Sequence, residues 1–131
     1  MANLTETPNS AKKVLIVEDE GEIALVLEMI LVDRHYHLDY VKTLDKAAQY
    51  LAENTPDIVI LDNKLPDGWG VDYTSEIRKN FPEARIIMIS GNGLIREEAL
   101  ENGADHFLTK PFSLDELYAA IDTARAEAHI A

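Results

Sequence analysis

Charged and hydroxyl-bearing side chains stand directly after several apolar runs of this sequence, and Asp62 is the clearest case. Asp62 follows the apolar residues 58–61 and precedes the turn-forming residues 63–68. A strand as apolar as residues 58–61 is normally buried on both faces, so its final carboxylate leaves the core at the carboxyl edge of a sheet, where α/β proteins place their binding sites. Because Asp also commonly begins turns, Asp62 alone does not show whether this position is a functional site or only the start of a turn.

Three other apolar runs end in polar residues that could act together with Asp62. Glu18 and Asp19 follow the first run, Ser90 follows the fourth, and Lys110 follows the fifth after one threonine. All of these positions lie at one edge of a parallel sheet, and in the strand order 2-1-3-4-5 the first and third strands are neighbours. We therefore expect Asp19 and Asp62 to face each other across a crevice.

The carboxylates at that edge predict a site for a hard cation, because like charges held close must be relieved by a proton or a metal ion. Oxygen ligands alone suit Mg²⁺, which typically takes one or two protein carboxylates together with phosphate oxygens. A carboxylate beside such an ion can attack a phosphoryl group and form an aspartyl phosphate. Lys110 and Ser90 would supply the cation and the donor that the charged transition state requires. Each alone could be an ordinary loop residue, but their joint placement favours a phosphoryl-transfer site.

The elements that must position these residues alternate regularly along the chain. Short apolar runs typical of strands lie at residues 12–17, 37–41, 57–61, 85–89 and 105–108. Each run is followed by apolar residues at helical spacing. Thr43 is expected to cap the second helix, and Gly103 to end a helix from about residue 94 to 102. A capping box at residues 113–116 begins a last helix that includes Ala124. This alternation predicts right-handed crossovers and a five-stranded parallel sheet of order 2-1-3-4-5, the flavodoxin-like, doubly wound (βα)5 three-layer α/β sandwich.

Composition limits the classes of function that this chain can have. Its 131 residues suffice for one domain with its own core, and the absence of cysteine excludes disulfide and thiolate chemistry. The net charge of -12 disfavours binding to the phosphate backbone of nucleic acids. With neither a signal peptide nor a long apolar span, the sequence predicts a cytoplasmic protein without membrane contact. The polar residues 1–11 are expected to form a disordered tail before one domain at residues 12–131.

From about residue 12 to residue 128, the sequence resembles the receiver domains of response regulators in two-component signalling. The matching blocks, in order, are VLIVEDE at residues 14–20, LD at 61–62, LP at 65–66 followed by Gly70, IS at 89–90, GAD at 103–105 and LTKPF at 108–112. Separate blocks in the right order make the resemblance specific. It implies a signalling domain that assists its own phosphorylation and slow dephosphorylation, and not an enzyme.

The resemblance implies roles for the acidic residues. Asp62 would accept a phosphoryl group from a histidine kinase or a phosphotransfer protein. Glu18 and Asp19 would form the acidic pair of the family, with Glu18 acting on the metal indirectly. The ligands of Mg²⁺ or Mn²⁺ would be Asp19, Asp62 and the backbone carbonyl of Lys64. In the family, the positions of Lys64 and Asn92 tune attack by water on the aspartyl phosphate, so these two residues leave the lifetime of the phosphorylated state open.

The resemblance also implies how phosphorylation would be reported to other proteins. Ser90 would be the switch hydroxyl, and Lys110, joined to Pro111 by a cis bond, would contact the phosphate. Phe107 would be the switch aromatic, although it could equally be a plain core residue. The changed surface would be the face of the fourth helix, fifth strand and fifth helix. No effector module follows residue 131, so we expect contact with a downstream protein, made by a single-domain regulator or an excised receiver.

Three other functions fit the same architecture less well. A flavodoxin-like cofactor binder needs a glycine-rich turn after the first strand, where the acidic residues 18–20 would repel phosphates. An aspartate-based phosphohydrolase commonly has a second acid two residues after its nucleophile, and this chain has Lys64 there. A binding module that works without phosphorylation would not need the full set of Asp19, Asp62, Ser90 and Lys110. The phosphohydrolase and the binding module stay as alternatives to the phosphoacceptor domain.

Overall fold

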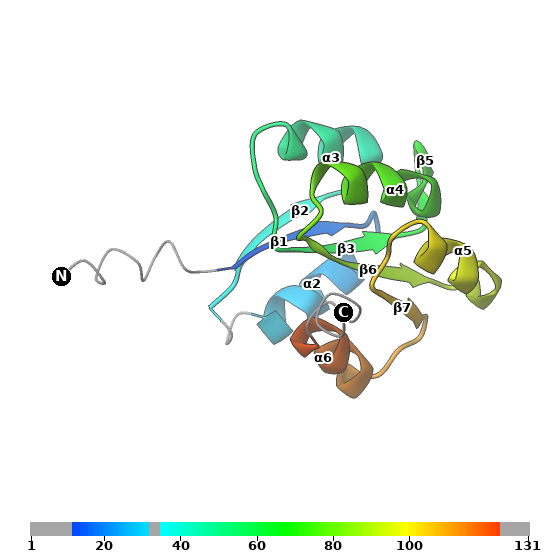
Figure 1. The fold of residues 1–131 in the computed structure, drawn as a ribbon. Coiled ribbons are helices and arrows are strands. Elements are labelled where there is room, and N and C mark those ends of the chain that lie inside the picture. The colour runs from blue at the N-terminus through cyan, green and yellow to red at the C-terminus, as the bar shows by residue number, and fades with distance from the viewer. Residues whose placement is uncertain (1–11, 32–34, 124–131) are drawn as a thin grey trace.

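The computed structural model describes residues 12–31 and 35–123, and a parallel sheet with helices on both faces lies at its centre (Figure 1). The five strands of this sheet are β1 (Lys13–Val17), β2 (His37–Val41), β3 (Ile58–Asp62), β6 (Arg85–Ser90) and β7 (His106–Thr109). They are ordered β2-β1-β3-β6-β7, and every neighbouring pair is parallel. This order confirms the predicted arrangement 2-1-3-4-5 and the flavodoxin-like α/β fold.

Two layers of helices enclose the sheet (Figure 1). One layer contains α3 (Leu44–Leu51), α4 (Gly70–Asn80) and α5 (Arg96–Glu101), and the other contains α2 (Gly21–Leu31) and α6 (Leu114–Asp122). Successive residues of a strand point to opposite faces, so Val59 and Leu61 pack in the first layer whereas Ile58 and Ile60 pack in the second. All four are at most 1 % exposed. Because β3 is buried on both faces, a polar residue on it can reach a site only from its end.

Local sequence signals begin and end the helices as predicted. Thr43 Oγ1 accepts a hydrogen bond from the backbone N–H of Lys46 at 3.0 Å and caps α3. Ser113 and Glu116 form the reciprocal capping box that begins α6. Gly103 follows α5 with a φ of 116°, a left-handed conformation that favours glycine at the end of a helix.

Two segments differ from the sequence prediction. The helix expected from residue 94 to 102 is divided into the 3-10 turn η2 (Gly93–Ile95) and α5, because Asn92 Oδ1 accepts a hydrogen bond from Leu94 N at 3.0 Å and caps the tighter turn first. The residues after β3 form a short antiparallel hairpin of β4 (Lys64–Leu65) and β5 (Gly68–Trp69). The predicted tail at residues 1–11 and Ala124 of the predicted last helix lie outside the described residues.

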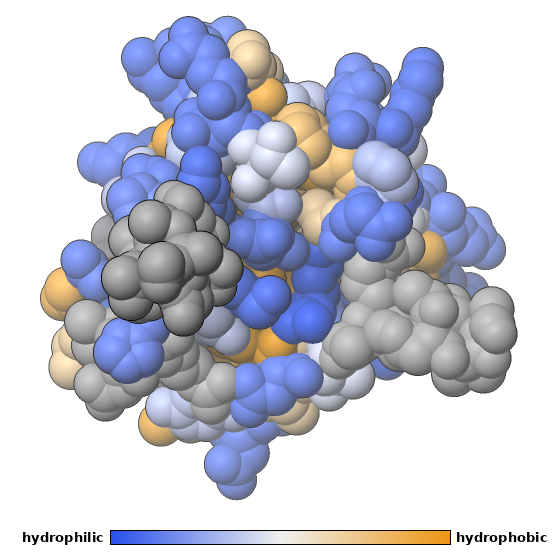
Figure 2. All heavy atoms as spheres, turned by 60° about the vertical axis from the view of Figure 1, so that its left-hand side comes forward, coloured by the Kyte–Doolittle hydropathy of each residue, from blue (hydrophilic) through white to orange (hydrophobic). Residues whose placement is uncertain are grey.

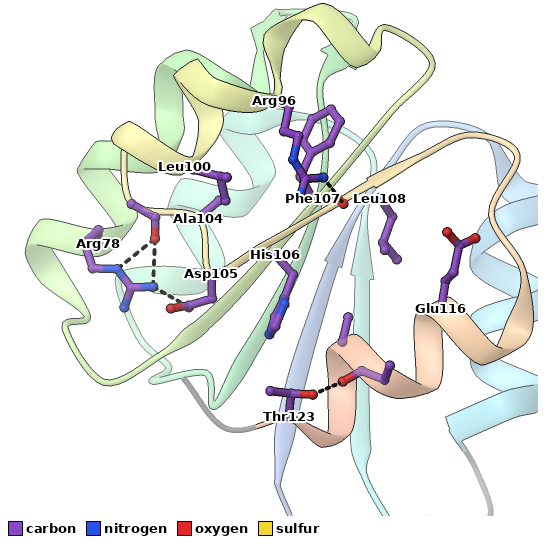
Figure 3. Close-up of a pocket in the computed structure, with 13 residues that line it drawn as sticks. Arg78, Arg96, Leu100, Ala104, Asp105, His106, Phe107, Leu108, Glu116 and Thr123 are labelled. Atoms are coloured by element: carbon purple, nitrogen blue, oxygen red, sulfur yellow. Dashed lines mark hydrogen bonds and ion pairs between the residues drawn. The ribbon is translucent and has the colours of Figure 1, made fainter. Parts of the chain in front are cut away.

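Arg78 joins α4 to the amino ends of β6 and β7. Its guanidinium donates to Ala84 O at 2.6 Å. It also donates to Gly103 O at 2.9 Å and forms an ion pair with Asp105 at 2.6 Å (Figure 3). The same oxygen of Asp105 accepts a hydrogen bond from Ile86 N at 2.9 Å. These bonds fix the amino ends of two strands whose carboxyl ends carry predicted site residues.

Polar and charged side chains cover most of the face seen in Figure 2, and apolar surface shows there mainly in the gaps between them. This distribution agrees with a chain that has 24 acidic and 12 basic residues. Within residues 12–31 and 35–123, the structure contains no helix with the length and apolar character needed to cross a membrane.

Candidate functional site

The carboxyl ends of four strands surround one pocket. Its volume is about 460 Å³, and residues at or just after the ends of β1, β3, β6 and β7 line it. The predicted site residues Asp19, Asp62, Lys64, Ser90 and Lys110 are all among the lining residues. The strand order therefore brings together, from four separate loops, the residue types that phosphoryl transfer requires.

Asp62 is held in place by the chain on either side of the hairpin. It is the last residue of β3 and is only 3 % exposed. The next residue, Asn63, donates its N–H to Ile89 O at 3.0 Å and accepts a hydrogen bond at Oδ1 from Val71 N at 2.9 Å. Gly70 N donates to Asn63 O at 2.6 Å. Asn63 is therefore bonded both to β6 and to the first turn of α4, and these bonds hold the adjacent Asp62 at the end of β3.

Lys110 lies against two carboxylates of the pocket. Its Nζ is 3.2 Å from Asp62 Oδ2 and 3.3 Å from Glu20 Oε1. Burial raises the pKa of Asp62 above its ordinary value, although the charge and hydrogen bond of Lys110 partly lower it. Burial lowers the pKa of Lys110, but the charges of Asp62 and Glu20 outweigh it, and the pKa is raised overall. The Lys110–Pro111 peptide bond is cis, as the resemblance implied.

Glu18, Asp19 and Asp62 form an acidic cluster that fits a hard cation. Each offers a carboxylate oxygen, and these three atoms lie within 4.8 Å of one another. Glu18 is fully buried, and its Oε1 has no hydrogen-bond partner among the described residues. Burial, with a smaller contribution from the charge of Asp62, raises the pKa of Glu18 to about 7. A divalent cation would lower the charge repulsion among these carboxylates and offset the missing hydrogen bond of the unpartnered oxygen.

The two predicted switch residues have separate surroundings. Ser90 is 3 % exposed, and its Oγ accepts a hydrogen bond from Asn92 N at 2.9 Å within its own loop. Phe107 is 5 % exposed and lines a second pocket beside α5 and α6. The Arg96 guanidinium lies over the Phe107 ring, 6.0 Å from its centroid. Ser90 thus belongs to the acidic pocket, whereas Phe107 belongs to the core next to another surface.

A family model described as the response regulator receiver domain matches residues 14–122 of this chain. The chain belongs to this family. The match spans every strand end that contributes to the acidic pocket, from β1 to β7, and it confirms the resemblance inferred from the separate sequence blocks.

Solved structures of other receiver domains are similar to this one over most of its length. The beryllofluoride-activated NtrC4 receiver domain dimer is 36 % identical with a TM-score of 0.80, and the match covers 88 % of this chain and 97 % of that chain. The response regulator TrrA from Thermotoga maritima, in complex with Mg²⁺ and beryllofluoride, is 30 % identical with a TM-score of 0.76 and coverage of 84 % and 96 %. The receiver domain of a putative Luxo repressor from Vibrio parahaemolyticus is 29 % identical with a TM-score of 0.80 and coverage of 92 % and 94 %.

These findings establish the class of function of this receiver domain. The family model and the two beryllofluoride complexes show a phosphoacceptor domain of two-component signalling, as the sequence predicted. The domain is a signalling phosphoacceptor, and its acidic cluster could hold a metal ion.

Sequence reasoning assigned no role to two acidic residues that lie in or beside the pocket. Glu20 contacts Lys110. The run of three consecutive acids after β1 could have placed Glu20 at this edge of the sheet, but it does not indicate the contact with the lysine. Asp67 lies in the turn of the hairpin, and its carboxylate accepts hydrogen bonds from Leu44 N and Asp45 N at 2.9 Å each. These bonds tie the hairpin to the start of α3 and lower the pKa of Asp67. No local pattern indicates that contact.

The raised pKa of Glu18 predicts how the stability of the domain depends on pH when Mg²⁺ is removed by EDTA. Its pKa rises from an ordinary 4.5 to about 7 on folding, so the folded state binds more protons between these values. The contribution of Glu18 to stability is full below pH 4.5 and is lost as pH rises through 7. As the pH rises from about 5.5 to about 8, the free energy of unfolding of wild type should fall by roughly 1 to 3 kcal/mol more than that of Glu18→Gln. Urea unfolding at the two pH values measures both changes. Equal pH dependence of the two proteins would refute this assignment.

Proposed function

We propose that Asp62 accepts a phosphoryl group from a histidine kinase or a phosphotransfer protein, in a reaction that requires Mg²⁺ or Mn²⁺. The observation that carries the proposal is the position of the Asp62 carboxylate between Lys110, 3.2 Å away, and the acidic cluster with Glu18 and Asp19. The cluster of carboxylates suits a divalent cation and the Lys110 ammonium suits an anionic group, and a phosphoryl transfer that requires a metal ion brings both to the pocket.

Asp62 and Lys110 have different roles in the proposed transfer. One oxygen of Asp62 attacks phosphorus, and the bond between phosphorus and the nitrogen of the donor breaks as the new bond forms. The hydrogen bond from Lys110 opposes the effect of burial and favours the ionised, nucleophilic form of Asp62. After transfer, the Lys110 ammonium pairs with the phosphoryl oxygens.

Asp19, Asp62 and the backbone carbonyl of Lys64 would hold the metal ion, with Glu18 acting indirectly from its buried position. When bound, the ion neutralises charge on the phosphoryl oxygens and lowers the repulsion among the carboxylates. Lys64 lines the pocket and pairs with Trp69 across the hairpin, an arrangement that supports this part of the proposal.

The output would be a changed protein-binding face. Ser90 would turn its hydroxyl from Asn92 toward the new phosphoryl group, and Phe107 would respond by repacking. Residues of α5, β7 and α6 line a second pocket of about 670 Å³ (Figure 3). In it, Arg96 lies over Phe107 and donates to Phe107 O at 3.3 Å, so movement of Phe107 would alter this surface. We propose that a downstream protein binds there, and that nucleic acid is not a direct partner of this acidic chain.

We also propose that residues 12–131 form one receiver domain and that the protein acts in the cytoplasm, where histidine kinases present their phosphoryl groups. The compact sheet and its two helical layers within residues 12–31 and 35–123 support the first statement.

The proposal is tested by incubating the protein with Mg²⁺ and acetyl phosphate and following its intact mass. Wild type should gain the mass of one phosphoryl group, and the gain should disappear with EDTA or with Asp62→Asn. The asparagine side chain keeps the shape of the residue but is a far weaker nucleophile than a carboxylate. Equal incorporation in wild type and Asp62→Asn would show that another residue is the acceptor.

A further inference from the structure

Glu20 is an acidic residue of the pocket to which the proposed reaction gives no role. It lines the pocket together with Asp62 and Lys110. Its Oε1 lies 3.3 Å from Lys110 Nζ. Among the described residues, the group whose oxygens could share a metal ion consists of Glu18, Asp19 and Asp62, so Glu20 stands apart from it. Within the described part of the chain, the side-chain partner of Glu20 in the pocket is therefore Lys110.

The exposure of Lys110 and of the two carboxylates beside it places Glu20 on the solvent side of the pocket. The side chain of Glu20 is 61 % exposed, that of Lys110 is 21 % exposed and that of Asp62 is 4 % exposed. The charge of the Glu20 carboxylate therefore lies beside Lys110 on its solvent-exposed side, where it acts on a molecule that reaches the lysine from solvent. The loop position of Glu20 is fixed, because its N–H donates to Glu18 Oε2 and α2 begins at the next residue.

The charge of Glu20 acts on the groups that would react. Burial is the main cause of the raised pKa of Asp62, and Glu20 adds to the increase against the lowering effect of Lys110. A negative charge that disfavours the ionised form of Asp62 also disfavours negative charge on a phosphoryl donor beside it. The bond between Glu20 and Lys110 acts in the same direction, since it occupies the cation that the phosphoryl oxygens would need.

Resting on the proposed phosphorylation of Asp62, we propose that Glu20 determines which phosphodonors the receiver domain accepts. Its carboxylate disfavours dianionic donors such as acetyl phosphate, relative to donors in which the phosphoryl group is bonded to nitrogen and a proton lowers the net negative charge. In phosphoramidate this proton is on the nitrogen bonded to phosphorus, and in phosphohistidine it is on the other ring nitrogen. With both kinds of donor, an Asp62 oxygen bonds to phosphorus while the bond to the leaving group breaks. Acetate leaves with the electron pair in the first case, and a neutral amine or imidazole leaves in the second.

The test compares rates of phosphoryl incorporation from acetyl phosphate and from phosphoramidate, measured by intact mass at saturating Mg²⁺. Glu20→Gln should raise the rate with acetyl phosphate by about tenfold and the rate with phosphoramidate by about threefold, because each unit of donor charge contributes a factor of about three at an exposed site. The ratio of the two rates should therefore rise by about threefold. This change in ratio should largely vanish in about 0.5 M KCl, since salt screens exposed charges.

Glu28→Gln is the matched control. It removes the same charge from an exposed residue of α2 that lines a different pocket, and the rate ratio should stay at the wild-type value. An unchanged ratio in Glu20→Gln, with incorporation that still depends on Asp62, overturns the role of Glu20 and leaves the phosphoacceptor assignment standing. An equal increase with both donors also overturns it, because it assigns Glu20 to holding Lys110 without selecting donors. Incorporation that persists in Asp62→Asn overturns the phosphoacceptor assignment and this inference together.

Discussion

Replacing Lys110 with methionine is expected to slow phosphoryl incorporation from acetyl phosphate by about 100-fold, the effect of removing one positioned donor from a charged transition state. Lys110 Nζ lies 3.2 Å from Asp62 Oδ2, so it can reach charge that develops on a phosphoryl group bonded to Asp62. Methionine keeps an unbranched apolar stem of similar length, so the pocket wall stays filled. What the variant loses is the ammonium group. Intact mass over time, at saturating Mg²⁺, gives the rate.

Mg²⁺ binding separates the loss of this ammonium from damage to the pocket. Loss of the Lys110 ammonium removes a positive charge that opposes a cation beside Asp62, so the Mg²⁺ affinity of the variant should equal or exceed that of wild type. Trp69, the single tryptophan, is exposed and pairs with Lys64 beside the pocket, so its fluorescence can follow the titration. Lys79→Met, at an exposed residue near the end of α4, should keep the wild-type rate. A Lys110→Met rate within about threefold of wild type would remove the lysine from the mechanism.

Residues at the strand ends could be predicted from the sequence because burial and the alternation of strands and helices are encoded locally. Residues 58–61 are apolar without interruption, which identifies a strand buried on both faces and places Asp62 at its end. Regular alternation of strands and helices then predicts a parallel sheet with right-handed crossovers. The order 2-1-3-4-5 comes from the flavodoxin-like doubly wound fold, and this order brings Asp19 to the same pocket as Asp62.

Contacts between loops could not be predicted in the same way, because they depend on the direction of a side chain after its strand has ended. The run of acids at residues 18–20 does not reveal that its last member turns toward Lys110 whereas its first is buried. Asp67 reads as an ordinary turn residue, yet its carboxylate caps the start of α3, far away in the sequence. Gly70 belongs to a sequence block of the family, but the structural reason for glycine at this position is its close contact with β3, which the sequence does not show.

Replacing Gly70 with alanine is expected to lower the free energy of unfolding by about 3 kcal/mol and to disturb the position of Asp62. A Cβ at residue 70 would lie 2.2 Å from Asp62 O and 3.1 Å from Leu61 Cγ. Neither neighbour can move easily, because β3 lies between β1 and β6 and is buried on both faces. The start of α4 would have to withdraw, although Gly70 N is bonded to Asn63 O at 2.6 Å. Urea unfolding measures the first effect, and phosphoryl incorporation without urea measures the second.

Gly21→Ala makes the same chemical change where an added Cβ meets no heavy atom within 4 Å. Alanine at this first residue of α2 should leave stability unchanged or raise it by up to about 1 kcal/mol, because it restricts the unfolded chain. Gly70→Ala and Gly21→Ala therefore add the same methyl group, in contact with β3 in the first variant and in open space in the second. If Gly70→Ala unfolds at the wild-type urea concentration, α4 can withdraw from β3 without cost, and the contact does not constrain the fold. If stability falls but the folded protein takes up phosphate at the wild-type rate, the contact supports the fold without positioning Asp62.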